Sequence, residues 1–393
     1  MTAESTSHLL RLLSAQSLAS RILKAPAVDL GLAEIEPFPF LAMVGQEEMK
    51  LALLLAIVNP NVGGVLLIGS RGTGKTTAVR SMADLLPVQQ RSLCLQGCSE
   101  EMLEEQGMDG LCDECAKRVG YGEPLTSEEK VRSVELPLNA RLDDVVGGID
   151  ERLAMEQNRM RLRRGILAQA DRNVLYVDEV NLLEDNVTDA ILDAAAQGYY
   201  TVRRGPLNLQ YWARFVLVGS MNPEEGNLRS QIMDRFGLRV VVRGLPDPEQ
   251  RFQAYEQALA YRLDPEQLAA LYAQDTLDMA EEVAKARARV SRVTIGPEAK
   301  RIGLQLIREM DVDSMRAEIT LFEAARAYAA ADDRSEVLPP DIGAVSLIAL
   351  RLRHSKGLEE FHRSQRSEDE RISALLSDHL NSLETDDEKG SAE

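Results

Sequence analysis

The sequence lacks long apolar runs and any surplus of positive charge. Its apolar stretches, of which Leu51–Val58 is among the longest, fall well short of the roughly 18 residues that span a membrane. We therefore expect a soluble protein. The 63 Asp and Glu residues outnumber the 45 Lys and Arg residues, for a net charge of −18. Because sequence-independent binding of nucleic acid depends on neutralising phosphates, this charge disfavours a nucleic-acid partner.

Cysteine and histidine are also scarce. The four cysteines all fall between positions 94 and 115, which argues against a disulfide framework spread over the chain. The four histidines lie outside the segment in which apolar strands alternate with helices, so we expect no metal ligation by imidazole in that core. They are His8, His354, His362 and His379.

The most informative motif directly follows the apolar run Val65–Ile68. It is a complete G-x-x-x-x-G-K-[ST] phosphate-binding loop, Gly69-Ser70-Arg71-Gly72-Thr73-Gly74-Lys75-Thr76, with Thr77 after it. The glycines let backbone N–H groups approach phosphate oxygens, Lys75 is suited to the β- and γ-phosphates, and the Thr76 hydroxyl is suited to Mg²⁺. A strand before the loop and a helical pattern after it are the context that the motif requires. The chain is therefore expected to bind a nucleoside triphosphate.

Polar side chains also follow two later apolar strands. The run Val174–Val177 ends in Asp178 and Glu179, the Walker B pattern, in which the first acid holds Mg²⁺ and the second activates the attacking water. The run Phe215–Gly219 leads to Asn222, whose amide can hydrogen-bond the γ-phosphate or that water. Together with the phosphate-binding loop, these residues predict a nucleotide hydrolase.

The alternation of helices and apolar strands predicts an α/β fold, in which helices flank a parallel sheet and the site lies at the carboxyl ends of the strands. We expect hairpins at Leu136–Asp150 and Gly198–Leu209. Beyond Pro246 the pattern is helical, over residues 248–262, 264–288, 297–310, 314–331 and 340–353.

The cysteines form two close pairs, Cys94-x₃-Cys98 and Cys112-x₂-Cys115, separated by 13 residues. This spacing is adequate for a tetrahedral Cys₄ zinc site, and an iron–sulfur cluster would accept the same ligands. A dithiol redox switch at Cys112 and Cys115, or four unligated thiols, are the alternatives.

With these motifs placed, residues 36–355 resemble the AAA+ ATPase subunit I family of magnesium chelatases. The resemblance is carried by Phe38-Pro39-Phe40 with Val44-Gly45-Gln46, by Val177-Asp178-Glu179-Val180-Asn181-Leu182-Leu183, by Gly219-Ser220-Met221-Asn222-Pro223-Glu224-Glu225-Gly226 and by Asp234-Arg235-Phe236-Gly237. The cysteine segment is a departure, because the chlorophyll-pathway members have a shorter stretch after the helix of the phosphate-binding loop.

The resemblance implies roles for further residues. Asn222 corresponds to sensor 1, Arg235 to the arginine finger and Arg316 to sensor 2. Arg203 or Arg204 is a further candidate for nucleotide sensing. It also implies a homo-oligomeric ring, expected to be a hexamer, with ATP bound between subunits.

The function implied by the resemblance is that of a motor. ATP hydrolysis would drive Mg²⁺ insertion into protoporphyrin IX by a large porphyrin-binding subunit, through a bridging subunit with an integrin-like domain, in (bacterio)chlorophyll biosynthesis for photosynthesis. One alternative is an ATPase for cobalt insertion or metal-cofactor maturation. The other is a DNA-remodelling ring, which the net charge of −18 disfavours.

Five parts are predicted along the chain. They are an N-terminal helical extension (1–35), an AAA+ α/β domain (36–245) with a cysteine-containing insertion (90–132), a helical linker (246–290), a helical lid (291–358) and an acidic tail (359–393). Residues 5–28 predict an amphipathic helix, with a transit peptide as the alternative. We expect a cytoplasmic location, with the plastid stroma as the alternative.

Overall fold

The computed structural model of the chain describes residues 36–94, 97–149, 162–204, 207–226, 228–312 and 314–353. The predicted N-terminal helix, the acidic tail and the four histidines lie outside these residues.

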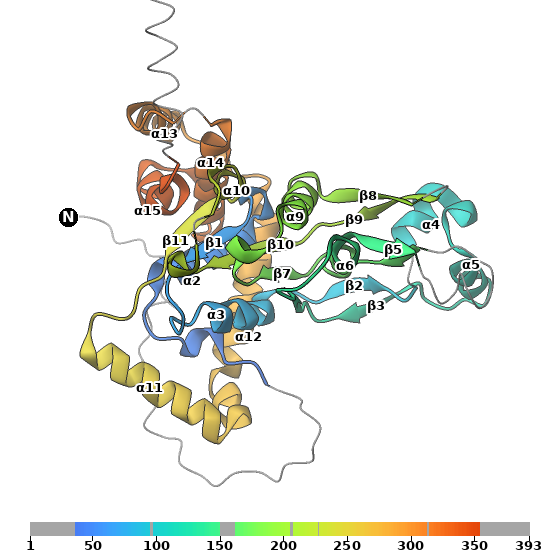
Figure 1. Cartoon of the computed structure of the whole chain (residues 1–393), viewed down its shortest axis with the longest axis horizontal. Helices are drawn as coiled ribbons and strands as arrows, with labels where there is room; N and C mark the ends of the chain where they lie inside the picture. The colour runs from blue at the N-terminus through green and yellow to red at the C-terminus, as the bar shows by residue number, and fades with distance from the viewer. Residues whose placement is uncertain are drawn as a thin grey trace, which may run out of the picture.

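A five-stranded parallel sheet forms the centre of the fold (Figure 1). Its strand order is β11-β1-β10-β7-β4, and every neighbouring pair is parallel. The strands are β1 (Val65–Ile68), β4 (Ser133–Leu136), β7 (Val174–Val177), β10 (Val216–Met221) and β11 (Leu238–Val241). The strands β1, β7 and β10 are buried at every position, as expected for a parallel sheet covered on both faces. The predicted α/β fold is confirmed.

Alternate side chains of β1 belong to two different cores. Val65 and Leu67 lie in a core shared with α2 (Glu47–Val58), α3 (Lys75–Met82), α12 (Pro265–Val290) and α14 (Met315–Ala331). Leu66 and Ile68 lie in a second core with α6 (Leu142–Val146), α8 (Ile166–Gln169), α9 (Asp185–Gln197) and α10 (Ser230–Arg235). Because successive strand side chains point to opposite faces, a four-residue strand is enough to anchor both helical layers.

Three antiparallel strand pairs extend from one side of the sheet (Figure 1). They are β2 (Gln89–Ser92) with β3 (Thr126–Glu129), β5 (Gly147–Ile149) with β6 (Leu162–Arg164), and β8 (Tyr199–Arg204) with β9 (Leu207–Trp212). The short helices α4 (Glu100–Gln106) and α5 (Asp113–Gly120) lie beyond their tips (Figure 1). Between β2 and β3, the chain therefore forms a small separate module that contains the four cysteines.

One of the two predicted hairpins is present and the other is wrong. The pair β8–β9 matches the hairpin expected over Gly198–Leu209. The hairpin expected over Leu136–Asp150 does not form, because Leu136 ends β4, which pairs in parallel with β7 at the edge of the main sheet. Helix α6 follows, and β5 pairs with the distant β6. The turn residues in this segment therefore follow an edge strand, in which only Leu136 is buried, and do not join two local strands.

The carboxyl-terminal part is helical, as predicted. It contains α11 (Pro248–Leu263), α12, α13 (Pro297–Glu309), α14 and α15 (Pro339–Leu350), with a two-stranded parallel pair of β12 (Thr294–Ile295) and β13 (Glu336–Val337). Proline occupies the first position of α11, α12, α13 and α15, where its missing N–H costs no hydrogen bond. No helix in the described ranges is long and apolar enough to cross a membrane.

Contacts with α2 anchor this helical part to the sheet. The Asn59 amide donates hydrogen bonds to the backbone carbonyl and the carboxylate of Glu323 on α14, at 3.1 and 2.7 Å. Arg287 of α12 donates to the carbonyl of Ile57. Short 3₁₀ turns complete the described structure at Phe40–Ala42, Pro60–Val62, Ala83–Leu85, Gly107–Gly110, Val180–Leu182 and Pro223–Glu225.

Candidate active site

The phosphate-binding loop leaves the carboxyl end of β1 and enters α3 at Lys75. Gly72 and Gly74 have φ values of +77° and +85°, a region that side chains with a Cβ rarely adopt. A Cβ on Gly69 would lie 2.1 Å from the carbonyl oxygen of Val242, so only glycine fits there. Gly74 caps α3 without a side-chain hydrogen bond, which leaves N–H groups at the start of the helix for an anion.

The Lys75 ammonium lies over the loop. Its Nζ donates hydrogen bonds to the carbonyl oxygens of Gly69 and Ser70, both at 2.7 Å. Burial lowers the pKa of Lys75, and the nearby Asp178 and Glu179 oppose that shift. The two acids therefore favour a charged lysine that is suited to bind phosphate oxygens.

Two candidate Mg²⁺ ligands are linked by a tyrosine that the sequence reasoning missed. The Tyr176 hydroxyl lies 3.0 Å from the Thr76 Oγ1 and donates a 2.9 Å hydrogen bond to the Asp178 Oδ1. Ser220 at the end of β10 also donates to the Asp178 Oδ1. A hydroxyl and a carboxylate are ligands that Mg²⁺ accepts, so Thr76 and Asp178 fit the ion. The alternation of side chains along a strand could have revealed this contact, because it puts residues 176 and 178 on the same face.

The Glu179 carboxylate faces the phosphate-binding loop. Glu179 adopts φ +50°, in the left-handed region, and its N–H donates to the Ser220 Oγ at 3.1 Å. Arg71 Nη2 lies 3.0 Å from a Glu179 carboxylate oxygen and 2.5 Å from one of Glu225. Arg71 of the loop thus pairs with two carboxylates at once, that of Glu179, the candidate base, and that of Glu225, which follows Asn222.

Asn222 lies at the same edge of the sheet. It is buried directly after β10, and its side-chain oxygen accepts a 3.3 Å hydrogen bond from the N–H of Glu224. The N–H of Gly69 donates to the carbonyl of Met221, the neighbour of Asn222. Parallel pairing of β1, β10 and β7 therefore brings the loop, Asn222 and the two acids to one edge.

Arg235 lies at the amino-terminal ends of the strands, opposite the edge that carries the phosphate-binding loop. It is the last residue of α10, shortly before β11, and Leu238 at the start of β11 pairs with Val65 at the start of β1. The phosphate-binding loop follows the other end of β1, about 10 Å along the strand. Arg235 pairs instead with Asp189 and Asp193 of α9, at 3.2 and 3.1 Å.

Arg316 lies near Arg235 and also away from the phosphate-binding loop of its own chain. Its Nη1 is 4.0 Å from the carboxylate of Asp234, the residue before Arg235. The same carboxylate accepts hydrogen bonds from Arg239, Arg353 and Ser314 at 3.3, 3.1 and 2.9 Å. Sequence reasoning did not identify Asp234 as the residue on which these groups converge.

Two other arginine candidates lie on the β8–β9 hairpin. Arg203 and Arg204 are near its tip, and Arg204 pairs with Asp143. The hairpin extends away from the sheet edge that carries the phosphate-binding loop (Figure 1). Within the chain, therefore, neither arginine joins the loop.

The four cysteines come together as their spacing predicted. The Sγ atoms of Cys94, Cys98, Cys112 and Cys115 all lie within 4.8 Å of one another, and none is in a disulfide. Burial raises the pKa of Cys98 to about 11.

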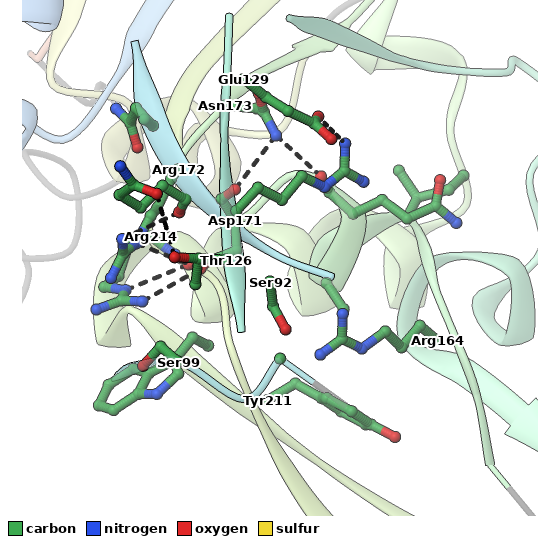
Figure 2. A pocket seen from close by; sticks show the side chains of 18 of the residues that line it. Ser92, Ser99, Thr126, Glu129, Arg164, Asp171, Arg172, Asn173, Tyr211 and Arg214 are labelled. Carbon is green, nitrogen blue, oxygen red and sulfur yellow. Dashed lines mark hydrogen bonds and ion pairs between the residues drawn. The ribbon is translucent and has the colours of Figure 1, made fainter. Parts of the chain in front are cut away.

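A groove of about 1330 Å³ separates this module from the base of the hairpins (Figure 2). Polar and charged side chains line it, among them Glu129, Arg164, Arg172 and Arg214, with Tyr211 and Trp212 from β9. None of the residues placed at the nucleotide-binding edge lines this groove.

Comparison with known proteins finds two matching family models and several relatives. Residues 152–235 match the model described as magnesium chelatase, subunit ChlI, and residues 304–375 match an AAA lid domain. The ChlI subunit of Pyropia yezoensis is 41% identical over 322 residues, which are 81% of this chain and 89% of that protein. A ChlI homologue from Methanocaldococcus jannaschii is 40% identical over 313 residues, 80% and 84% of the two chains.

Among solved structures, a complex of BchI and BchD of magnesium chelatase contains a chain with 36% sequence identity. The match covers 83% of this chain and 99% of that one, with a TM-score of 0.46.

Proposed function

The chain belongs to the ChlI family of magnesium chelatase subunits, and we propose that it is the AAA+ ATPase motor of such a chelatase. In this role it couples ATP hydrolysis to the insertion of Mg²⁺ into protoporphyrin IX, for (bacterio)chlorophyll biosynthesis. The observation that carries the proposal is the 41% identity over 81% of the chain, combined with the arrangement of the phosphate-binding loop, Asp178, Glu179 and Asn222 at one edge of the sheet.

The chemistry of the nucleotide site follows from the contacts within it. The amides of the Gly69–Thr76 loop and Lys75 would bind the ATP phosphates. Thr76 and Asp178 would hold the Mg²⁺ that accompanies ATP, and this ion would neutralise charge on the phosphate oxygens. Glu179 would take the proton of the attacking water, and Asn222 would orient that water.

Glu179 is held in place by two contacts before it acts. Ser220 accepts its backbone N–H, and Arg71 pairs with its carboxylate. Because the Arg71 side chain is 72% exposed, its ion pair is weak enough for the guanidinium to exchange a carboxylate for a phosphate oxygen.

The positions of Arg235 and Arg316 support a ring. Both arginines lie at the sheet edge opposite the phosphate-binding loop, so they would act on ATP bound by the next subunit. A guanidinium supplied by a neighbour makes hydrolysis depend on assembly. We propose a homo-oligomeric ring, a hexamer, which works on a bridging subunit and a large porphyrin-binding subunit. ATP and Mg²⁺ are the cofactors of this reaction, and a zinc ion at the four cysteines would be structural.

The test is a reconstitution with fluorescence detection of Mg-protoporphyrin. The full chain, the two partner subunits, ATP, Mg²⁺ and protoporphyrin IX should yield product only when all are present. A Glu179→Gln chain in the same mixture should bind ATP and yield none. If rings with normal ATPase activity and intact partners give no Mg-protoporphyrin, the chelatase proposal fails, and an ATPase for cobalt insertion or metal-cofactor maturation takes its place.

A further inference from the structure

The module between β2 and β3 has almost no apolar core. Helix α4 has no buried residue, and the only buried residue of α5 is Cys115. The buried residues of the module's hydrophobic cluster are Cys94, Cys98, Cys115 and Leu125, so three of its four members are cysteines. Burial of so few side chains cannot offset the conformational entropy of ordering about 30 residues. The module therefore needs a further source of stability.

The four thiols are arranged for a single metal ion. With zinc–sulfur bonds of about 2.3 Å, sulfurs at the corners of a tetrahedron stand about 3.8 Å apart. The four Sγ atoms lie within 4.8 Å of one another, which is close to that spacing. Cysteines that bind different irons of an iron–sulfur cluster must surround a larger group. The compact set therefore favours one ion.

Backbone N–H groups are directed at the sulfurs. The Cys98 N–H donates to the Cys94 Sγ at 3.4 Å, and the Cys112 N–H donates to the Cys98 Sγ at 3.3 Å. The Ser92 hydroxyl lies 3.3 Å from the Cys94 Sγ. A neutral thiol is a weak acceptor, whereas a metal-bound thiolate is anionic and is stabilised by such donors.

A positive side chain lies against Gly97, the residue before Cys98. The Arg164 Nη2 is 2.5 Å from where a Cβ on Gly97 would stand, so the guanidinium packs directly on this glycine. The Nε of Arg164 is buried without a hydrogen-bond partner, and among the described residues no carboxylate forms an ion pair with Arg164. Four thiolates around Zn²⁺ carry a net charge of −2, which would compensate this guanidinium. Four neutral thiols would not.

From these contacts we infer that Cys94, Cys98, Cys112 and Cys115 bind one zinc ion, and that this ion folds the module between β2 and β3. The module forms one wall of the groove in Figure 2, to which Gly97, Ser99 and Met102 contribute. Glu100 on α4 fastens it to β3, because its carboxylate accepts hydrogen bonds from the N–H of Leu125 and from the N–H and hydroxyl of Thr126. The inference does not rest on the proposed chelatase function.

The first experiment uses the full-length protein, purified without chelator. Metal analysis should find one zinc per chain, and a mercurial reagent should release it as four thiols react. Protein grown with Co²⁺ should show thiolate-to-cobalt charge transfer and the strong visible bands of a tetrahedral site. Zinc well below one equivalent with four freely alkylated thiols would overturn the inference, and so would stoichiometric iron with iron–sulfur absorption.

Variants test whether the ion holds the module together. Cys112→Ser with Cys115→Ser should lose the zinc and make residues 97–125 sensitive to proteolysis, while ATP binding at the distant loop persists. Should that variant fail to fold, Arg164→Gln provides a milder test. It should weaken zinc affinity by roughly tenfold or more, as changes around metal ligands do. Arg163→Gln is the matched control, because Arg163 is exposed and pairs with Asp144. Equal zinc affinity in both arginine variants would remove Arg164 from the argument.

Discussion

Ser314 donates a 2.9 Å hydrogen bond to the carboxylate of Asp234, and this contact joins the helices that carry the two candidate interface arginines. Asp234 precedes Arg235 at the end of α10, and Ser314 caps α14, which contains Arg316. The other oxygen of Asp234 accepts hydrogen bonds from Arg239 and Arg353. One carboxylate thus links the α/β core to the helical part at the edge where a neighbouring subunit would bind.

Asp234 should be essential for stability. Arg239 and Arg353 have side chains that are 1% and 0% exposed, and burial together with Arg353 lowers the pKa of Arg239 to about 10. Asp234→Asn would leave two buried guanidiniums without their counter-charge, and should cost about 3–5 kcal/mol of unfolding free energy. Asp189→Asn, which removes a partly exposed partner of Arg235, should cost no more than about 1 kcal/mol. Denaturant titration of both variants measures these losses of unfolding free energy. Equal losses would contradict the role of Asp234 as the counter-charge of Arg239 and Arg353.

ATP binding and hydrolysis should separate at two residues. Lys75→Ala should lose ATP affinity, because hydrogen bonds to the carbonyls of Gly69 and Ser70 hold the lysine ammonium over the phosphate-binding loop. Glu179→Gln should keep ATP affinity but lower turnover by about 10²-fold or more, the usual contribution of a general base. Nucleotide binding by fluorescence and phosphate release measure the two effects. Hydrolysis by Glu179→Gln at the parent rate would show that another group activates the water.

Arg235 and Arg316 should both act on the neighbouring subunit. Rings that mix Arg235→Ala with Lys75→Ala chains should regain ATPase activity, because some interfaces then pair an intact loop with intact arginines. The Arg316→Ala and Lys75→Ala mixture should recover for the same reason. Arg235→Ala mixed with Arg316→Ala should not, since every interface lacks one arginine. If Arg316→Ala with Lys75→Ala fails to recover in verified mixed rings, Arg316 serves its own subunit.

Tyr176→Phe should affect the magnesium requirement more than ATP binding. The hydroxyl links Thr76 and Asp178, so its loss should raise the Mg²⁺ concentration needed for half-maximal ATPase activity. Burial raises the pKa of Tyr176 to about 12, so the hydroxyl keeps its proton at neutral pH. The variant should therefore retain the parent pH–rate profile between about pH 7 and 9. A changed profile with an unchanged magnesium dependence would contradict this role.

The sequence by itself determined the features that depend on neighbouring residues. The loop Gly69–Thr76 could be identified because only glycine tolerates its backbone, and β1, β7 and β10 because short apolar runs bounded by turns form buried strands. The helical pattern beyond Pro246 predicted the carboxyl-terminal helices, of which α11, α12, α13 and α15 begin with a proline. The close approach of the four cysteines followed from their spacing along one short segment.

Only the tertiary structure decided what depends on the order of the strands. Ser220 meets Asp178 because β10 lies beside β7, and Leu136 belongs to the main sheet because β4 pairs with β7. The link from Asp234 to Ser314 spans 80 residues and requires the helical part to pack beside β11. Local propensities carry no information on such pairings, since each depends on which distant surfaces are buried together. For the same reason, only the folded chain shows that Arg316 lies beside Asp234, at the edge of the sheet opposite the phosphate-binding loop.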